Sequence, residues 1–191
     1  NYRQDGGQVP HTRQQFRRKS RRLEEDGAVI LERIDDATGY AAYADDMKRI
    51  YNERWADDYS LAPDDAYYRC RTEAVESLFA ERCMVLFLLK IDGVPCAFRL
   101  GFKQRGKYYD WKLSHDPRLR YFSPGLLMTG KVIEHLIAEN YTEMNFMAGD
   151  YSWKRSWAPR GPQSINHEFF ASDRSLRARL YLKYRLAWRA R

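Results

Sequence analysis

Two apolar runs joined by an Asp-Gly pair constrain the fold of this chain more than any other feature. The first run, Met84 to Ile91, is apolar except for one lysine, and the second extends from Cys96 to Lys103. Asp92-Gly93 between them is typical of a β-hairpin, because both residues tolerate the left-handed backbone of a two-residue turn. A third strand, Lys107 to Ser114, follows Gln104-Arg-Gly106, so the middle of the chain is predicted to be an antiparallel meander.

Helical periodicity lies on both sides of this meander. From Thr38 to Trp55 the large apolar residues recur every three or four positions, which predicts one amphipathic helix of about five turns. A second helix is predicted from about Asp64 to Arg82, and a third from Ser123 to about Asn140. A basic helix from Thr12 to Glu25 precedes a first strand at Ala28 to Ile34.

Later elements complete the predicted fold. Short strands are expected at Thr142 to Met147 and Ser164 to Ala171, and a last helix at Leu176 to Arg189. This order of elements predicts an α+β fold, with a mixed, mostly antiparallel sheet and helices on its faces.

Composition excludes several classes of protein. The chain has 191 residues and its longest apolar run, Met84 to Leu89, is far shorter than the roughly 20 residues that a membrane span needs. The three cysteines fit neither a disulfide framework nor a zinc pair, so we expect reduced thiols in a cytoplasmic protein. The four histidines are scattered, and metal catalysis is not expected. Because the chain opens on Asn1 rather than Met, an additional upstream domain is an expected partner.

The net charge of +7 is concentrated at the two ends of the chain. Residues 12 to 22 and 174 to 191 hold thirteen of the 33 lysines and arginines and no acidic residue, which leaves 20 basic against 26 acidic residues elsewhere. We therefore predict a basic N-terminal segment at 1–27, a main domain at 28–172 and a basic C-terminal helix at 173–191. The basic ends are expected to contact an anionic membrane surface or RNA, and deleting residues 174 to 191 should weaken that binding.

The helix that begins at Ser123-Pro124-Gly125 offers a first candidate site. A helix N-terminus attracts phosphate or pyrophosphate, and Gly125 would let a ligand approach the backbone. Arg118 and Arg120, just upstream, could neutralise a diphosphate. The alternative is an ordinary helix with Ser123 as its N-cap and two solvated arginines.

A second candidate site follows the predicted strand at Thr142 to Met147. Gly149, a carboxylate and several aromatic and basic side chains are concentrated there, which is typical of a site at the end of a strand; they are Asp150, Tyr151, Trp153, Lys154 and Trp157. In the alternative interpretation the two tryptophans pack as one helical face and Asp150 caps that helix.

The strand Lys107 to Ser114 alternates two sets of side chains. Tyr109, Trp111 and Leu113 are expected to face a core, and the alternate set to point the other way, where it could line a cleft; that set is Tyr108, Asp110 and Lys112. A half-buried strand without a site is the alternative. The sequence has no GxSxG and no Walker loop.

Several of these motifs, taken in order, resemble the acetyltransferase-like domain of CelD-type cellulose biosynthesis proteins. This is a bacterial branch of the GNAT superfamily that is related to Fem-type aminoacyl transferases. The motifs are Asp116-Pro117, Ser123-Pro124-Gly125-Leu126-Leu127 and Phe146-x-x-Gly149-Asp150-x-x-x-Lys154-x-x-Trp157. Of the usual phosphate loop only Arg120 and Gly125 match, in an altered spacing. Asn145 and Ala148 stand where relatives often carry an acidic residue and an arginine.

The resemblance implies a GNAT fold in which two central strands separate and admit the pantetheine arm of acetyl-CoA or another acyl-CoA. The implied function is acyl-CoA-dependent N-acyl transfer to an amino sugar or another small amine in polysaccharide or envelope metabolism, in the cytoplasm or at the inner face of the membrane. The alternatives are a Fem-like transferase that uses aminoacyl-tRNA and a non-catalytic interaction domain.

The roles that follow from this resemblance fall into three groups. Asp150 would be the base or the amine anchor, Lys154 a substrate or oxyanion contact, and Tyr109 or Tyr151 the acid. The acyl-CoA would be held by residues around the helix start, which are Arg118, Arg120, Ser123, Gly125 and Leu126. Three tryptophans, Trp111, Trp153 and Trp157, would stack on a sugar acceptor.

Overall fold

The computed structural model describes residues 11–26, 29–55, 66–149 and 151–158. The predicted strand Ser164 to Ala171, the last helix at Leu176 to Arg189, and Asp150 lie outside this part of the chain. None of the described helices is long and apolar enough to cross a membrane. The described residues also contain no cluster of three or more His, Cys, Asp or Glu side chains suited to a metal ion.

Five strands form one sheet in the order of the sequence. They are β1 (Val29–Ile34), β2 (Met84–Ile91), β3 (Val94–Gln104), β4 (Lys107–His115) and β5 (Glu143–Asn145). The first four pair antiparallel, whereas β5 runs parallel to β4. The predicted α+β class, with its mixed and mostly antiparallel sheet, is confirmed.

The hairpin predicted from Asp92-Gly93 joins β2 to β3. Asp92 and Gly93 have φ angles of 50° and 79°, the pair of left-handed residues that a tight hairpin turn needs. Met84 to Leu89 is buried along its whole length, because helices cover both faces of the sheet at this strand.

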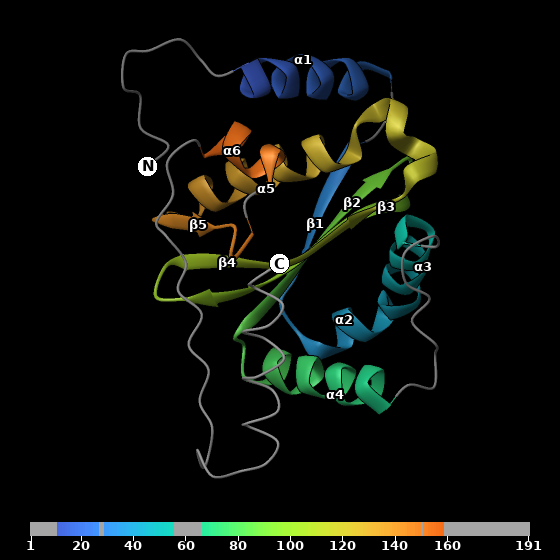
Figure 1. Ribbon diagram of the computed structural model, residues 1–191, viewed down its shortest axis with the longest axis vertical. Helices are drawn as coiled ribbons and strands as arrows, with labels where there is room; N and C mark the ends of the chain where they lie inside the picture. The colour runs from blue at the N-terminus through green and yellow to red at the C-terminus, as the bar shows by residue number, and fades with distance from the viewer. Residues whose placement is uncertain (1–10, 27–28, 56–65, 150, 159–191) are drawn as a thin grey trace, which may run out of the picture. The chain divides into compact units, whose positions relative to one another are not determined.

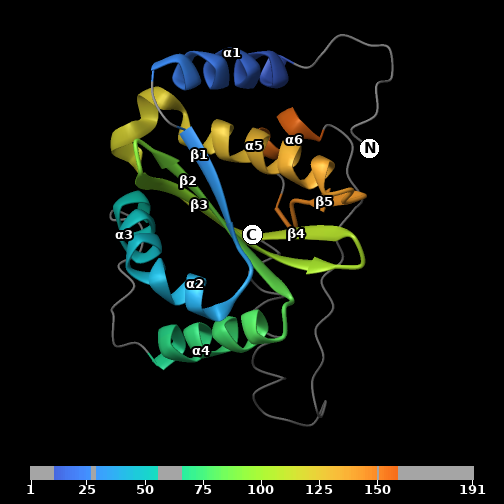
Figure 2. The ribbon, with the colours of Figure 1, turned by 180° about the vertical axis from the view of Figure 1, so that it is seen from behind.

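Two layers of helices sandwich the sheet (Figures 1 and 2). One face carries α1 (His11–Asp26), α5 (Pro124–Ala138) and α6 (Ser152–Trp157), and the other carries α2 (Ala37–Ala42), α3 (Ala44–Trp55) and α4 (Ala66–Ala80). Each layer has its own core. The first core includes Phe87, Leu127 and Trp157, and the second includes Ile50, Phe79 and Leu86.

The predicted five-turn helix from Thr38 to Trp55 is wrong in one respect, because Tyr43 interrupts it. The chain turns at this residue, and its two halves are α2 and α3. The turn lets Tyr40 stack on Phe79 of α4, with ring centroids 4.9 Å apart. It also lets the Tyr43 hydroxyl reach Glu32 on β1 at 3.1 Å and accept from Lys90 on β2 at 2.8 Å. Contacts with the sheet therefore outweigh the continuity of the helical pattern.

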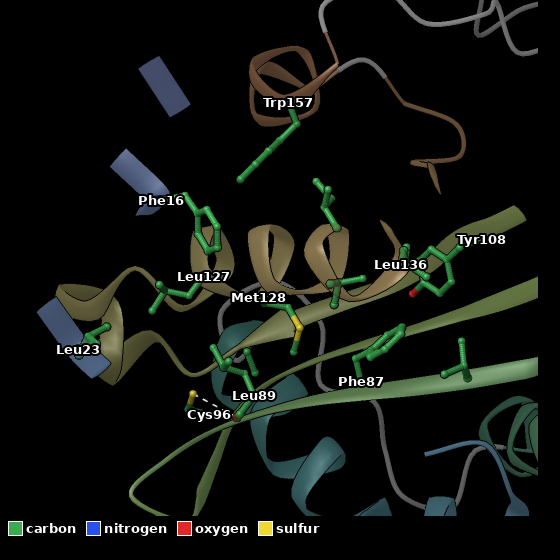
Figure 3. Close-up of a cluster of buried hydrophobic side chains, with 14 residues drawn as sticks. Phe16, Leu23, Phe87, Leu89, Cys96, Tyr108, Leu127, Met128, Leu136 and Trp157 are labelled. Carbon is green, nitrogen blue, oxygen red and sulfur yellow. Dashed lines mark hydrogen bonds between the residues drawn. The ribbon is translucent and has the colours of Figure 1, made fainter. Parts of the chain in front are cut away.

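The basic helix α1 lies on the layer formed by α5 and α6. Its two large apolar residues, Phe16 and Leu23, are buried in the first core, where Figure 3 shows Phe16 pointing toward the space between α5 and Trp157. Four arginines, at positions 17, 18, 21 and 22, are exposed on the helix. Three of them, with Glu25, line an open surface hollow of about 530 Å³; these are Arg18, Arg21 and Arg22.

Candidate functional site

The parallel pairing between β4 and β5 is short. It joins Lys107 to Glu143, Tyr108 to Met144 and Tyr109 to Asn145, where β5 ends. β4 continues to His115, so from Asp110 onward its outer edge has no strand partner within the described residues. The backbone N–H and C=O groups on the outer edge of this half of β4 therefore make no hydrogen bonds to any other described strand and could bind another group.

A β-bulge lies on the other edge of β4 at the same level. Asp110 pairs with Gly101 and Lys112 with Leu100, so Trp111 is an extra residue in β4. Trp111 packs against Phe102 in the second core, with ring centroids 5.5 Å apart. The bulge therefore changes which face of the sheet the following side chains occupy.

Tyr108 and Asp110 point away from Trp111, as predicted, but both are buried under α5 instead of lining a cleft. Lys112, predicted to lie with them, lies on the Trp111 side, where its Nζ is 4.6 Å from the centroid of the Tyr51 ring. Tyr108 is 0% exposed and Asp110 is 6% exposed. Figure 3 shows Tyr108 beside Phe87 and Leu136, where α5 covers the sheet. Gly101 makes room for Tyr108, since a Cβ there would lie 2.5 Å from the tyrosine hydroxyl oxygen. The sequence periodicity could not indicate which face α5 would cover.

A buried ion pair lies beneath α5 at the level where β5 ends. The Arg99 guanidinium is fully buried and its Nη1 lies 3.2 Å from Oδ2 of Asp110. Arg99 Nη2 donates to Thr129 Oγ1 at 2.7 Å, and Thr129 Oγ1 donates to the Gly125 carbonyl at 2.8 Å. Four buried polar atoms here have no hydrogen-bond partner in the described part of the chain, although one of them, Arg99 Nη1, is in the ion pair with Asp110. They are Arg99 Nε, Arg99 Nη1, Asp110 Oδ1 and Tyr108 Oη. Unpaired polar atoms in a core are rare, and each calls for an explanation such as a buried water, an ion or a catalytic role.

The surroundings of Asp110 shift its pKa toward a value at which the carboxyl group can exchange a proton. Burial raises the pKa of Asp110, although the nearby charges of Arg99 and Lys154 act against this shift. Burial lowers the pKa of Lys154, with Asp110 opposing it, and burial also raises the pKa of Tyr108 well above its ordinary value. Perturbed groups gathered in one place are typical of functional sites.

The turn after β5 covers the ion pair. The rings of Phe146 and Trp153 have their centroids 5.9 Å and 6.0 Å from the Arg99 guanidinium carbon. Lys154 Nζ donates to the carbonyls of Phe146 and Ala148, each at 2.7 Å, so it fastens this turn to α6. Lys154 was predicted to contact the substrate or an oxyanion. That role stays a prediction, and it would use the third N–H of the ammonium, whose nitrogen lies 3.4 Å from the Met147 carbonyl oxygen.

The N-terminus of α5 has fewer free backbone donors than the sequence suggested. Pro124 has no N–H, and the N–H groups of Leu126 and Leu127 both bond to the Ser123 carbonyl. Ser123 occupies the predicted N-cap position with a left-handed backbone, but its side chain does not cap the helix. Its Oγ instead accepts from Lys19 Nζ of α1 at 2.5 Å.

The other residues predicted to hold acyl-CoA lie around this helix start. Gly125 lies against His115, with the imidazole Nδ1 3.4 Å from the position of a Cβ. Arg118, in the 3-10 helix η1 (Pro117–Phe122), is already paired with Asp116 at 2.7 Å. Arg120 is exposed, and Leu126 packs against the first core. Their cofactor roles stay predictions.

The three tryptophans predicted to stack on an acceptor are not brought together. Trp111 belongs to the second core, whereas Trp153 and Trp157 lie on the α5 face. Trp157 is 6% exposed and meets Phe16 edge-on. Tyr109 is the last β4 residue in the ladder with β5, and Tyr151 is exposed beside Lys154. The structure leaves the predicted roles of these residues open.

Sequence reasoning missed Arg99 and Thr129. Arg99 interrupts an otherwise apolar strand, Cys96 to Phe102, and a charged residue in a buried strand is costly unless it is paired. That signal could have identified it. Nothing in the local sequence around Thr129 distinguishes it from an ordinary helix residue.

Comparison with protein families gives one match that covers most of the chain. A family model described as "Acetyltransferase (GNAT) domain" matches residues 10–155. Comparison with curated proteins gives no significant match.

Solved structures support the same fold. An aminoglycoside acetyltransferase, meta-AAC0020, from an uncultured soil metagenomic sample, in complex with sisomicin, has a TM-score of 0.53 at 13% identity, covering 76% of this chain and 97% of that one. A GNAT family acetyltransferase of Staphylococcus aureus has a TM-score of 0.54 at 9% identity, covering 74% and 99%. At these identities the likeness describes the fold alone.

Proposed function

The chain belongs to the GNAT acetyltransferase family, and on this premise we propose that it transfers an acyl group, acetyl in the first place, from acyl-CoA to the nitrogen of an amine. The observation that carries the proposal is the edge of β4. The pairing with β5 stops at Tyr109, a bulge follows at Trp111, and the carboxyl of Asp110 lies between them with one oxygen unpartnered.

The residues along this edge fit an acyl-CoA. The backbone of β4 beyond Tyr109 would hold the amide groups of the pantetheine arm. The diphosphate would lie near the start of α5, with Lys19 at Ser123 and the exposed Arg120 as the nearby cations. Gly125 itself lies against His115, and Arg118 is engaged by Asp116. When bound, acyl-CoA supplies a thioester whose acyl group an amine can accept.

Asp110 is the carboxylate best suited to take the proton of the attacking amine. It is buried, its pKa is raised, and its Oδ1 has no partner among the described residues. A base of this kind contributes about 10²-fold or more to such a transfer. Tyr109 and Tyr151 remain the candidate acids, and Asp150 a second candidate base.

An amino sugar or another small amine is the acceptor class that we propose. One of the solved structures with this fold is an aminoglycoside acetyltransferase in complex with sisomicin. The likeness to CelD-type domains supports a place in polysaccharide or envelope metabolism, in the cytoplasm or at the inner face of the membrane.

Ligand binding and turnover test this function together. We expect acetyl-CoA to raise the melting temperature, with a stabilisation of about 2.7 kcal/mol at a hundredfold excess over its Kd. Asp110→Asn should keep that shift and lower the transfer rate to a panel of amino sugars about tenfold or more. If no acyl-CoA moves the melting temperature, the proposal is wrong.

The exposed arginines of α1 favour a second candidate, a transferase that takes an aminoacyl group from tRNA. Three of them line the hollow with Glu25, and arginines bind phosphates well. Stabilisation by tRNA at low salt, lost at high salt and combined with no response to acyl-CoA, would favour this alternative.

A further inference from the structure

A continuous row of contacts joins Asp110 to the N-terminal turn of α5. It passes from Asp110 Oδ2 to Arg99 Nη1 at 3.2 Å, from Arg99 Nη2 to Thr129 Oγ1 at 2.7 Å, and from Thr129 Oγ1 to the Gly125 carbonyl at 2.8 Å. Asp110, Arg99 and Thr129 are all buried. They come from three different elements, β4, β3 and α5, so only the tertiary fold brings them together.

We propose that Arg99 and Thr129 are positioning residues for the Asp110 carboxylate. Thr129 fixes the Arg99 guanidinium, and Arg99 in turn orients Asp110 so that its free oxygen faces the amine. This inference rests on the proposed function, in which Asp110 is the base.

The hydrogen-bond directions explain why Thr129 is suited to this task. Its hydroxyl proton is committed to the Gly125 carbonyl, four residues earlier in the same helix. The hydroxyl oxygen therefore presents its lone pairs to Arg99, which has only donors. A valine of the same shape would keep the packing but offer no acceptor to the guanidinium.

Arg99 is the nearest cation to Asp110, but other groups also face the carboxylate. Lys154 of α6 acts on it from the covering turn, and Tyr108 lies two residues away on the same face of β4. Phe146 and Trp153 lie close to the guanidinium and help to keep it buried. Because two rings pack close to the guanidinium and Thr129 accepts from its Nη2, Arg99 has little freedom to turn away from Asp110.

A purely structural role would lower activity equally at every pH, so a pH profile separates the two roles. We would measure kcat/KM for acetyl transfer from pH 5 to 9 in the wild type, Thr129→Val and Thr129→Ser. The base must be ionised to act, so activity falls as the pH drops below its pKa. An opposite charge close to a carboxyl lowers its pKa by about 1 to 3 units, and loosening Arg99 removes part of that effect.

For Thr129→Val we expect the acid limb to move up by about half a unit or more. Activity should fall several-fold at the acid end and stay near wild type on the alkaline plateau, with an unchanged KM for acetyl-CoA. Thr129→Ser keeps the hydroxyl and should keep the wild-type profile. Arg99→Lys keeps the charge but loses the fork, and should shift the limb in the same direction. A profile for Thr129→Val that overlays the wild type overturns the proposal.

A second measurement does not depend on turnover. The Asp110 carboxyl carbon, assigned by comparison with Asp110→Asn, can be titrated by NMR in the wild type and in Thr129→Val. A higher Asp110 pKa in the valine variant supports the positioning role, and an unchanged pKa refutes it. If the wild type neither binds nor uses acyl-CoA, the proposed function fails, whereas the NMR comparison still decides whether Thr129 and Arg99 hold Asp110.

Discussion

Phe16 of α1 occupies the space that a side chain on Gly130 of α5 would need. A Cβ built on Gly130 would lie 2.3 Å from the nearest carbons of the Phe16 ring, far inside van der Waals contact. Phe16 also meets Trp157 of α6 edge-on, with ring centroids 6.1 Å apart. The absence of a side chain at Gly130 thus fixes where the basic helix docks.

This docking predicts strong coupling between the two positions. Gly130→Ala should lower the free energy of unfolding by about 1 to 3 kcal/mol, because the methyl group collides with the ring. Phe16→Ala removes a buried ring and should cost about 3 kcal/mol, or less if α1 detaches. In the double variant the alanine at 130 should cost nothing, since the ring is gone. Chemical denaturation of the four proteins measures this cycle, and additive losses would contradict it.

Tyr108→Phe should leave the protein as stable as the wild type or more stable. The Tyr108 hydroxyl is fully buried and has no hydrogen-bond partner among the described residues, a loss of hydration that costs about 1 to 3 kcal/mol. Phe keeps the ring contact with Phe87 and the fit against Gly101. Thermal and urea unfolding test the expectation. A clear loss of stability would show that the hydroxyl has a partner, such as a buried water.

The start of η1 predicts a stability change at low pH. Hydrogen bonds from Arg118 hold the pKa of Asp116 below its ordinary value, against the effect of burial. This contribution is therefore complete above the unfolded pKa of about 4 and is lost as the pH falls through the lower folded value. At pH 7 the wild type should therefore have a higher unfolding midpoint than Asp116→Asn, and the two midpoints should converge toward pH 3.

A matched variant separates the charge of Asp116 from its role as N-cap. Its side chain accepts from the Arg118 backbone N–H at 2.9 Å, a bond that asparagine can also accept. Asp116→Ala should therefore cost about 1 kcal/mol more than Asp116→Asn at every pH. Equal losses for the two variants would show that the cap contributes little.

Much of the fold follows from local signals in the sequence. The Asp92-Gly93 turn and the apolar runs beside it predict the β2–β3 hairpin. The helix predicted from Ser123 begins in the structure at Pro124, with Ser123 as the preceding N-cap residue. The break at Tyr43 could not be predicted, because it depends on Glu32, Lys90 and Phe79, which are distant in sequence.

The site was less predictable, because pairing between strands determines it. The bulge at Trp111 arises from the register of β4 with β3, and it breaks the alternation after this residue, so that Lys112 lies on the same side as Trp111. A strict alternation of side chains wrongly grouped Lys112 with Tyr108 and Asp110, and it could not show that α5 buries those two residues. Only the packing of α5 on the sheet brings Thr129 to Arg99.

Lys154 allows a test between a substrate contact and a structural clamp. Lys154→Ala should lower the acyl-transfer rate about tenfold or more, and so should Asp150→Asn tested beside it. As a clamp, Lys154 holds the carbonyls of Phe146 and Ala148, so its loss should loosen the turn over Arg99 and speed amide exchange there. If Lys154 instead contacts the substrate, Lys154→Ala should raise the KM for the acceptor and leave amide hydrogen exchange in the turn unchanged. Near wild-type rates in both variants would remove both residues from the site.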